Sequence, residues 1–477
     1  ALRGINGSYR VYKKCGGIRK GLGAEKRRKK NMKLIYDVKD KPSFGKVVIF
    51  ALQQLLAILA ATIAVPTIVQ NGMSQSAALF GAGIGTLVYL LFTKFRSPVF
   101  LGSSFAFIGS MLAAFAGAVS AEAGHAGLII GAAFAGIVYV IIAIIVKFVG
   151  VGWINKLMPA VVIGPTVSII GLSLAANAVS DITKGKVLDA EGNSAANPLI
   201  CLLCGLITLL VVTICSVYGK KMVKLIPFII GILAGYAAAA IFTVIGIATD
   251  NPSLQIINFE VFRNMGIVSV PDFTFLEAAK GFEKIDGQYI ATVAVAYVPV
   301  AFVVFAEHIA DHKNLSSVIE KDLLEEPGLH RTLLGDGVGS VAGALFGGCP
   351  NTTYGESVGC VAITGNASVV TIFATAVMAI IISFFGPFVT FLSTIPNCVM
   401  GGVCVTLYGF IAVSGLKMIQ EVDLNDNRNL FVVAVILICG IGGLTVSFGK
   451  ITITSIACAL ILGIITNVIL GRKKKAE

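Results

Sequence analysis

The chain has 477 residues, of which 56 % are hydrophobic and only 13 % are charged, and its formal net charge is +12. Soluble globular domains carry about 25 % charged residues, so this composition excludes an ordinary soluble protein. Apolar runs such as 47–69 and 429–447 are long enough to cross a hydrocarbon core of roughly 30 Å. The sequence lacks the ten-residue alternating segments that are typical of a membrane β-barrel. We therefore predict an all-α polytopic membrane protein.

The positive charge is concentrated at the start of the chain. Residues 1–31 hold eleven Lys or Arg and one Glu, a net +10, so the other 446 residues contribute only +2. A basic arm can bind anionic lipid or nucleic acid. However, AGG-AGG codons at Arg27 and Arg28, just before the first methionine, Met32, would form a bacterial ribosome-binding sequence. We expect 1–31 to be a non-native leader, 32–46 to be a cytoplasmic N-terminal segment, and nucleic acid not to be a partner.

Apolar runs broken at proline, glycine and charge clusters predict about fourteen membrane segments. The third and tenth are short and contain glycine, and an amphipathic loop helix is predicted over 315–334. Predicted inner loops and the C-terminal tail carry sixteen Lys or Arg, against six in the outer loops, which places both termini in the cytoplasm. The segments are 47–69, 76–93, 104–119, 126–148, 158–176, 198–217, 223–247, 289–310, 335–348, 354–364, 368–392, 397–416, 429–447 and 452–470.

The two halves of the chain resemble each other. MPAVVIG at 158–164 and IPNCVMG at 395–401 share P-x-x-V-[IM]-G at the start of the fifth and twelfth segments. SPVFLGSSFAFIG at 97–109 and GGCPNTTYGESVG at 347–359 both place a proline and strand-type residues before a polar, glycine-bearing helix start. Because seven spans is an odd number, the second half would be inverted. We predict a 7+7 inverted repeat, and its two interruptions indicate a transporter binding site.

The interruptions suit a polar ligand. Non-helical backbone at membrane depth is tolerated where it is buried in protein or lines a cavity. We expect extended stretches over 97–103 and 347–353 to meet near the midplane, each followed by a half-helix. The N-terminus of a half-helix offers free N–H groups and a positive dipole end to a carbonyl oxygen. Gly355 permits close backbone approach, and Phe105 offers an aromatic face for stacking.

Carboxylates are scarce at membrane depth, where each costs about 2.5–3.5 kcal/mol to insert. Glu356 lies at the start of the tenth segment and Glu307 near the end of the eighth, so both are candidate ligands. Alternatively, Glu356 caps its helix and Glu307 marks only the interfacial end of its helix. Glu307 and Asp311 share a helix face at i, i+4, and such a pair is a candidate proton acceptor, unless Asp311 merely starts the next loop. His308 is on another face and is expected to be structural.

No catalytic motif accompanies these residues. The sequence has no H-E-x-x-H and no G-x-G-D, and Gly335-Asp336-Gly337 lies at a predicted loop edge, so we expect no enzyme. The C-x-x-C at Cys201 and Cys204 lies within an apolar run without histidine partners, which favours packing residues over a metal site. A passive channel would place polar residues along whole helices, whereas this chain has two short polar breaks. A carrier without a metal or cofactor is the remaining interpretation.

Five motifs occur in order along the chain. They are LQQLLAILAATIAVP (52–66), LGSSFAFI (101–108), AEHIADH (306–312), EPGLHRTLLGDG (326–337) and PNTTYGESVGCVAIT (350–364). With them, the chain from about residue 42 to the C-terminus resembles the bacterial uracil permeases of the nucleobase–cation symporter family, the nucleobase–ascorbate transporter group. This group also contains xanthine and urate permeases.

The resemblance implies two domains. A core domain, 47–148 and 289–392, would carry the substrate, and a gate domain would comprise 158–247 and 397–470. Family members pair through the gate as homodimers and move the core in an elevator-like way. The implied function is import of uracil or a related nucleobase across the bacterial inner membrane. A proton would be co-transported, with Na⁺ as the alternative coupling ion.

The resemblance also implies how a base is held. Glu307 and Glu356 would accept hydrogen bonds from its N–H groups. The backbone N–H groups of Phe105 and Gly355 would donate to its carbonyl oxygens. The side chains of Ala61 and Tyr354 would line the pocket. Glu307 and Asp311 would couple the proton.

The chain departs from the family pattern in several places. Ser357 replaces the asparagine of the signature, no cation follows Thr364, Asp311 replaces a frequent histidine, and Gln54 replaces a histidine of the first span. Purine-type members usually carry Gln at the position of Glu356, which favours uracil over the alternative, a xanthine or purine permease. Sulfate and bicarbonate carriers share the inverted repeat, but their ligands need a cation near the tenth span.

Overall fold

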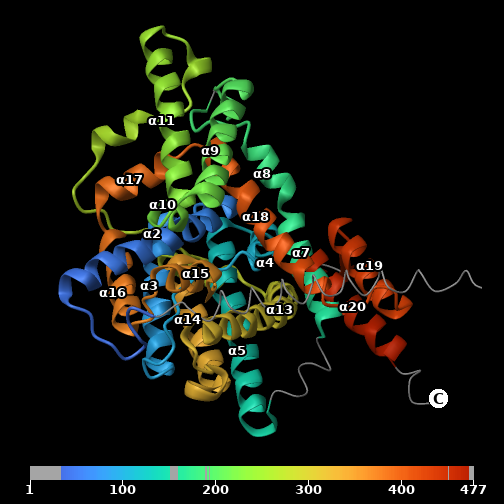
Figure 1. The fold of residues 1–477 in the computed structure, drawn as a ribbon. Coiled ribbons are helices and arrows are strands. Elements are labelled where there is room, and N and C mark those ends of the chain that lie inside the picture. Colours follow the sequence, from blue (N-terminus) through green and yellow to red (C-terminus); the bar gives the residue numbers. More distant parts are fainter. Residues whose placement is uncertain (1–33, 151–158, 189–190, 193, 449–450, 472–477) are drawn as a thin grey trace, which may run out of the picture.

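The computed structural model describes residues 34–150, 159–188, 191–192, 194–448 and 451–471 (Figure 1). The predicted leader, 1–31, lies outside these ranges. Within them, eight helical segments are long and apolar enough to cross a membrane. They are α2 (Phe44–Val69), α3 (Gln75–Phe92), α5 (Ala121–Val149), α7 with α8 (Ala160–Ser173 and Ala175–Asp181), α9 (Pro198–Tyr218), α11 (Pro227–Ala248), α13 (Gly287–Ile319) and α18 (Asn397–Ile419).

Shorter elements connect and cover these helices. Each of the fourteen predicted segments overlaps at least one helix, and the all-α polytopic class is confirmed. The fourteen-span count and the inverted repeat stay predictions. The shorter helices are α4 (Ile108–Ala116), α10 (Met222–Leu225), α12 (Thr274–Gly281), α14 (Leu329–Gly347), α15 (Gly355–Thr364), α16 (Val369–Ile382), α17 (Gly386–Thr394), α19 (Asn427–Ile441) and α20 (Ser455–Gly471), with short 3₁₀ or π segments at Pro252–Leu254, Phe259–Asn264, Phe282–Lys284 and Leu324–Gly328.

The prediction of a separate loop helix over 315–334 is wrong. α13 continues to Ile319, the chain leaves the helix at Glu320 with a left-handed φ of 54°, and α14 begins only at Leu329. Pro327 and Gly328, whose φ is 98°, interrupt the helix because proline lacks an N–H and glycine tolerates positive φ. Consequently Glu307 and Asp311 lie inside α13 rather than at its end. Asp336, predicted at a loop edge, is only 1 % exposed inside α14.

Two short buried strands pair with each other. β1 (Leu101–Ser103) and β2 (Asn351–Thr353) pair antiparallel, with Leu101 opposite Thr353 and Ser103 opposite Asn351. They lie inside the extended stretches predicted at 97–103 and 347–353, and the short helices α4 and α15 follow them. A second antiparallel pair, β3 (Val446–Phe448) and β4 (Ile451–Ile453), lies between α19 and α20.

Hydrogen bonds that involve side chains join the β1–β2 ribbon to neighbouring helices. Buried backbone groups need hydrogen-bond partners, and a two-stranded ribbon leaves two edges open. The Leu101 N–H donates to Thr86 Oγ1 of α3 at 2.9 Å, and the Phe100 N–H donates to Ser357 Oγ of α15 at 3.0 Å. On the other strand, Asn351 Nδ2 donates to the Gly81 carbonyl of α3 at 2.9 Å. These bonds fix the ribbon against α3 and α15.

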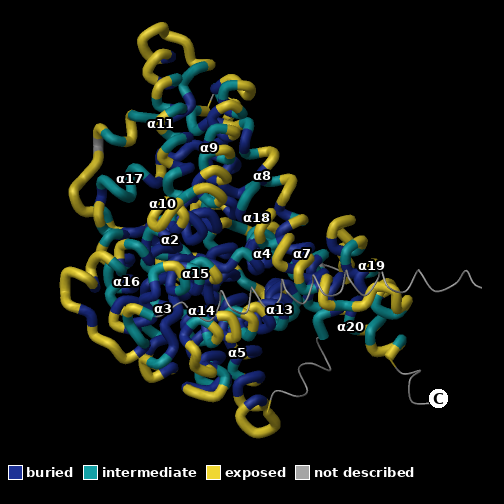
Figure 2. The backbone as a smooth tube through the Cα atoms, viewed as in Figure 1, coloured by how far each residue is buried: buried dark blue, intermediate teal, exposed yellow. Residues whose placement is uncertain are grey.

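The helices pack in two groups. In the first, α14 packs on α3 and α5, α16 on α2 and α3, and α13 on α5. In the second, α18 packs on α7 and α9, α11 on α9, and α19 on α7 and α20 (Figure 1). The helices differ in how far protein buries them (Figure 2). In α2 of the first group, 67 % of the most apolar stretch of the helix is buried, against 33 % in both α9 and α11 of the second group. The exposed apolar sides of α9 and α11 fit a membrane environment.

Small residues bring α7 and α18 into close contact. A Cβ atom on Gly415 would clash with the Gly164 carbonyl and with Ser168. Ser168 Oγ lies 3.1 Å from both the Gly164 and the Ala412 carbonyl oxygens. Small residues at a helix interface allow this backbone approach in membranes. The α7–α18 pair is therefore a tightly joined unit.

The segment 34–40 is bonded to the link between α15 and α16. The Ile35 N–H donates to the Gly365 carbonyl at 2.7 Å, and the Ala367 N–H donates to the Tyr36 carbonyl at 2.9 Å. Lys321 Nζ, beyond the end of α13, donates to Asp37 Oδ2 at 2.5 Å. This hydrogen bond is the main reason that the pKa of Asp37 lies below its usual 3.8.

Replacing Asp37 by Asn should slightly destabilise the protein at neutral pH. A depressed carboxyl pKa contributes stability above the unfolded-state pKa, and this contribution is lost as the pH falls through the folded-state value. Both partners are nearly half exposed, so the expected loss in Tm at pH 7 is below about 2 °C. Thermal unfolding in detergent should show this loss at pH 7 and a smaller loss near pH 3. Lys321→Gln should give the same loss, and additive losses in the double variant would contradict the pairing.

Candidate functional site

A cavity of about 410 Å³ lies between the two groups of helices. Its polar wall comes from α13, α15 and the ends of β1 and β2. Its other wall is almost entirely apolar and comes from α7, α11 and α18. The apolar wall includes Ile163, Val167, Phe228, Leu407, Phe410 and Met418, with Ser414 as its polar residue.

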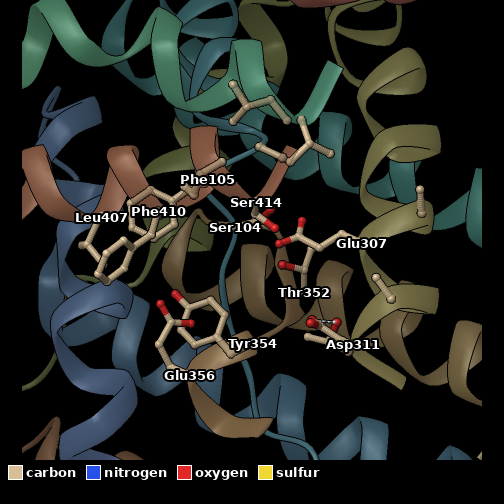
Figure 3. A pocket seen from close by; sticks show the side chains of 18 of the residues that line it. Ser104, Phe105, Glu307, Asp311, Thr352, Tyr354, Glu356, Leu407, Phe410 and Ser414 are labelled. Carbon is tan, nitrogen blue, oxygen red and sulfur yellow. Dashed lines mark hydrogen bonds between the residues drawn. The ribbon is translucent and has the colours of Figure 1, made fainter. Parts of the chain in front are cut away.

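Three carboxylates face the cavity. Figure 3 shows Glu356 beside Tyr354 on one side, and Glu307 with Asp311 on the other. The Thr353 hydroxyl donates to Asp311 Oδ2 at 2.8 Å, which orients this carboxylate from β2. Among the described residues that line the cavity, none is Lys, Arg or His. The arrangement therefore favours a ligand that donates hydrogen bonds and disfavours an anion.

A helix start opens into the same space. α15 begins at Gly355, and Tyr354 at its N-cap makes no side-chain capping bond. The first N–H groups of a helix have no intrahelical acceptor, so Gly355 and its neighbours can donate to a ligand oxygen. Phe105 also lines the cavity, but α4 begins three residues later, at Ile108. Gly355 is therefore the first residue of its half-helix, as predicted, whereas a turn separates Phe105 from the start of α4.

The Tyr354 ring lies against the backbone of β1. Its hydroxyl donates to the Ser103 carbonyl at 2.7 Å, and a Cβ atom on Gly102 would clash with the ring. Glycine at 102 is thus required by the close approach of the ring rather than by its backbone angles. The Gly102–Tyr354 contact fixes one side of the cavity.

Gly102→Ala should lower substrate uptake at least about tenfold, because overpacking of 1–3 kcal/mol would push Tyr354 towards the cavity. Initial uptake rates in proteoliposomes, normalised to the amount of folded protein, measure the effect. Gly409→Ala is the matched control, since a Cβ atom there meets nothing within 4 Å. Equal uptake by the two variants would show that the Tyr354 position is unimportant.

Most of the residues predicted for the site come together. Glu307, Asp311, Glu356, Tyr354, Gly355 and Phe105 all line the cavity. Ala61 does not: it is 1 % exposed within α2 and is not among the lining residues. The roles assigned to all of these residues stay predictions.

Sequence reasoning missed several lining residues. Ser104 and Thr352 lie within the motifs at 101–108 and 350–364, and the polar NTTYGES run was a signal for Thr352. Ser414 and the apolar wall lie in helices whose sequence gives no such signal, since their side chains are those of ordinary membrane helices. Two residues that depart from the family pattern are bonded to each other, since Gln54 Nε2 donates to Ser357 Oγ at 2.5 Å.

Comparison with known proteins supports a transporter. Residues 45–448 match the model of the Permease family. The chain is 38 % identical to a uracil permease of Bacillus subtilis (strain 168), over 92 % of this chain and 96 % of that protein. It is 38 % identical to a uracil permease of Bacillus caldolyticus, over 93 % and 97 %, and 34 % identical to one of Escherichia coli (strain K12), over 90 % and 92 %.

Solved structures share the fold at low identity. The transmembrane domain of the cyanobacterial bicarbonate transporter BicA matches with a TM-score of 0.61 at 16 % identity, covering 88 % of this chain and 96 % of that one. The murine anion transporter Slc26a9 matches with a TM-score of 0.59 at 13 % identity, over 91 % and 69 %. These likenesses concern the fold alone. By its sequence relatives, the chain belongs to the Permease family, among transporters of the bacterial uracil permease type in the nucleobase–ascorbate group, and not to a family of enzymes.

Proposed function

We propose that this protein imports uracil across the bacterial inner membrane together with a proton. The observation that carries the proposal is the cavity, which sets Glu307 and Glu356 on opposite sides of a space that also contains the start of α15. Uracil is a flat ring with two N–H donors and two carbonyl acceptors. The carboxylates match the donors, the backbone N–H groups at the helix start match the acceptors, and Phe105 offers a face for stacking.

Substrate selection follows from charge and size. The absence of a basic residue among the described lining residues argues against bicarbonate or sulfate, although the fold also occurs in anion transporters. A second candidate is xanthine or another purine, because a volume of about 410 Å³ leaves room for a bicyclic base. Glu356 favours uracil, since purine-type members usually carry Gln there.

The division of the cavity walls supports an elevator mechanism. The carboxylates and the helix start belong to the group of α2–α5 and α13–α16, the proposed core, 47–148 and 289–392. The facing wall belongs to the proposed gate, 158–247 and 397–470, and is apolar except for Ser414. An apolar wall has few hydrogen bonds to break when the core slides past it. Pairing as a homodimer through the gate, with both termini in the cytoplasm, completes the proposal.

The proton is assigned to the Glu307–Asp311 pair on α13. Two carboxylates one helical turn apart in a buried wall repel when both are ionised, so a proton on one of them is favoured. Binding a base N–H and binding a proton would then be linked at Glu307. Na⁺ remains the alternative coupling ion, and no cofactor is proposed.

Uptake of radiolabelled uracil into proteoliposomes tests the proposal. We expect accumulation when the outside is more acidic than the inside, and little accumulation without a pH gradient. Unlabelled uracil should compete, and xanthine should compete weakly. Accumulation driven by a Na⁺ gradient alone would overturn the proton assignment, and preference for xanthine would favour the second candidate.

A further inference from the structure

The two walls of the cavity differ in polarity, and the division follows the two groups of helices. Glu307 and Asp311 on α13 and Glu356 at the start of α15 form the polar wall. The facing wall of α7, α11 and α18 has Ser414 as its polar residue, and its other lining residues are apolar. A ligand in this cavity therefore meets hydrogen-bonding groups on one side and an apolar surface on the other.

The uracil ring is divided in the same way. Its four polar positions, N1–H, C2=O, N3–H and C4=O, are consecutive in the ring, so C5 and C6 form one apolar edge. In the proposed binding mode, the carboxylates and the N–H groups at the start of α15 take the polar positions. The C5–C6 edge then points away from the polar wall and towards the apolar wall.

Two aromatic rings form a corner in the apolar wall. Phe228, the second residue of α11, and Phe410 of α18 both line the cavity. Their ring centroids are 6.2 Å apart and their planes meet at 70°, which is an edge-to-face arrangement. Figure 3 shows Phe410 away from Glu307 and Asp311. Because Phe410 is 54 % exposed and lines the cavity, part of its ring can contact a ligand.

The cavity is larger than a single pyrimidine ring requires. Its volume of about 410 Å³ falls within the roughly 300–1,000 Å³ of pockets that enclose drug-sized ligands. An apolar group attached to the C5–C6 edge can fill the space between a bound uracil and the Phe228–Phe410 corner. Burying such a group is favourable, because it removes apolar surface of the ligand and of the corner from water.

A polar extension of the same edge is not equivalent. Xanthine is a uracil ring with a second, nitrogen-containing ring fused at the C5–C6 edge. Against the apolar wall, the nitrogen atoms of this second ring would lose hydrogen bonds to water without gaining others. The wall therefore favours an apolar extension over the bicyclic base of the second candidate function.

We propose that the cavity also binds uracils that carry a benzyl-sized apolar group at C5 or C6, and that such compounds are held without being carried. The uracil ring occupies the polar wall, and the added group packs in the Phe228–Phe410 corner. This inference rests on the proposed uracil transport and names a class of inhibitor for the same site.

The arrest follows from the proposed elevator movement. The polar wall belongs to the proposed core and the corner to the proposed gate, so the two would slide past each other during transport. Uracil travels with the core, because its hydrogen bonds are all made there. A benzyl group that projects into the corner of the gate obstructs this movement, since packed side chains leave no room for it along the wall.

Four isomers of benzyluracil test the binding mode with the same atoms in each. Displacement of radiolabelled uracil from the purified protein gives the Kd of each isomer. We expect 5-benzyluracil or 6-benzyluracil to bind at least as tightly as uracil. We expect 1-benzyluracil and 3-benzyluracil to bind at least about 30-fold more weakly than uracil, because each lacks an N–H that a carboxylate accepts. Xanthine should bind more weakly than the better C-benzyl isomer.

Phe410→Ala tests the corner itself. It should raise the Kd of the better C-benzyl isomer at least about fivefold more than it raises the Kd of uracil, because the benzyl ring loses an aromatic partner. Phe431→Ala is the matched control: Phe431 is 60 % exposed on α19 and is not among the lining residues. In this control the ratio of the two Kd values should stay that of the wild type.

Exchange across the membrane tests the arrest. Proteoliposomes loaded with unlabelled uracil should take up external radiolabelled uracil by exchange. Proteoliposomes loaded instead with the better C-benzyl isomer should take up at least about tenfold less, because the loaded compound stays bound and is not carried outwards. Equal exchange with the two loads would show that the benzyl compound is carried, and would overturn the inference.

Failure of the inference is distinguishable from failure of the proposed function. A Kd above that of uracil for both C-benzyl isomers overturns the inference, and so does equal binding of all four isomers, which would indicate unspecific apolar binding. In both cases uracil binding and uptake leave the proposed function standing. A protein that binds no uracil overturns both. The isomer comparison uses the wild-type protein, so it decides even if Phe410→Ala does not fold.

Discussion

Glu356→Gln should reduce uracil uptake at least about 100-fold. In the proposed binding mode the carboxylate can accept hydrogen bonds at both oxygens, whereas the Gln amide would turn one of them into a donor that faces the N–H of the base. Losing a charge-assisted hydrogen bond and gaining an opposed donor costs about 3 kcal/mol, which corresponds to this factor. Radiolabelled uracil uptake and equilibrium binding to the purified protein should fall together, because the change acts on binding itself.

Glu421→Gln is the matched control for this experiment. Glu421 is exposed just beyond the end of α18, so the same chemical change there should leave uptake and binding intact. Thermal unfolding of both variants shows whether the protein remains folded. Normal uracil binding by folded Glu356→Gln would exclude Glu356 as a ligand and would move attention to Glu307 and the helix start of α15.

Glu307→Gln should abolish uptake against a concentration gradient and remove its pH dependence. Gln cannot bind or release a proton, so the step that links proton movement to the base would be lost. Because the amide oxygen still accepts one hydrogen bond, exchange of internal for external uracil should persist at a reduced rate. Comparing accumulation with exchange between pH 5 and 8.5 separates the coupling from the binding of the base.

Asp311→Asn identifies which member of the pair carries the proton. If Glu307 is the carrier, Asp311→Asn should keep accumulation and alter only the pH midpoint, since Thr353 can still hydrogen-bond the Asn oxygen. A Glu307→Gln variant that retains the wild-type pH profile would contradict the assignment. In that case Asp311 would be the first alternative.

Some features of the site follow from local sequence. Proline, glycine and polar residues at apparent membrane depth predicted extended stretches, and β1 and β2 lie inside them. The strength of this signal is physical, because a broken helix in lipid requires partners for every backbone group. The i, i+4 spacing likewise put Glu307 and Asp311 on one face, and both line the cavity.

Other features could not be predicted from the local sequence. The end of α13 was placed too early because the charged run after Glu307 looks like the start of a loop, yet its His308 and His312 are buried against α14 and α3. Polar residues pair inside this protein, so polarity alone does not mark a helix end. The prediction that Asp336 lies at a loop edge is wrong for the same reason, since Asp336 is buried inside α14.

The sequence by itself determined the membrane class, the helical segments and the two polar breaks, because hydropathy and helical periodicity depend on neighbouring residues. It also determined which residues share a helix face. Only the tertiary structure decided which faces meet: Gln54 with Ser357, Tyr89 with His312, and the apolar wall of α7 and α18 with the carboxylates of α13 and α15. Periodicity indicates that a face is buried, but the partner is set by packing between segments hundreds of residues apart, and no local pattern encodes that choice.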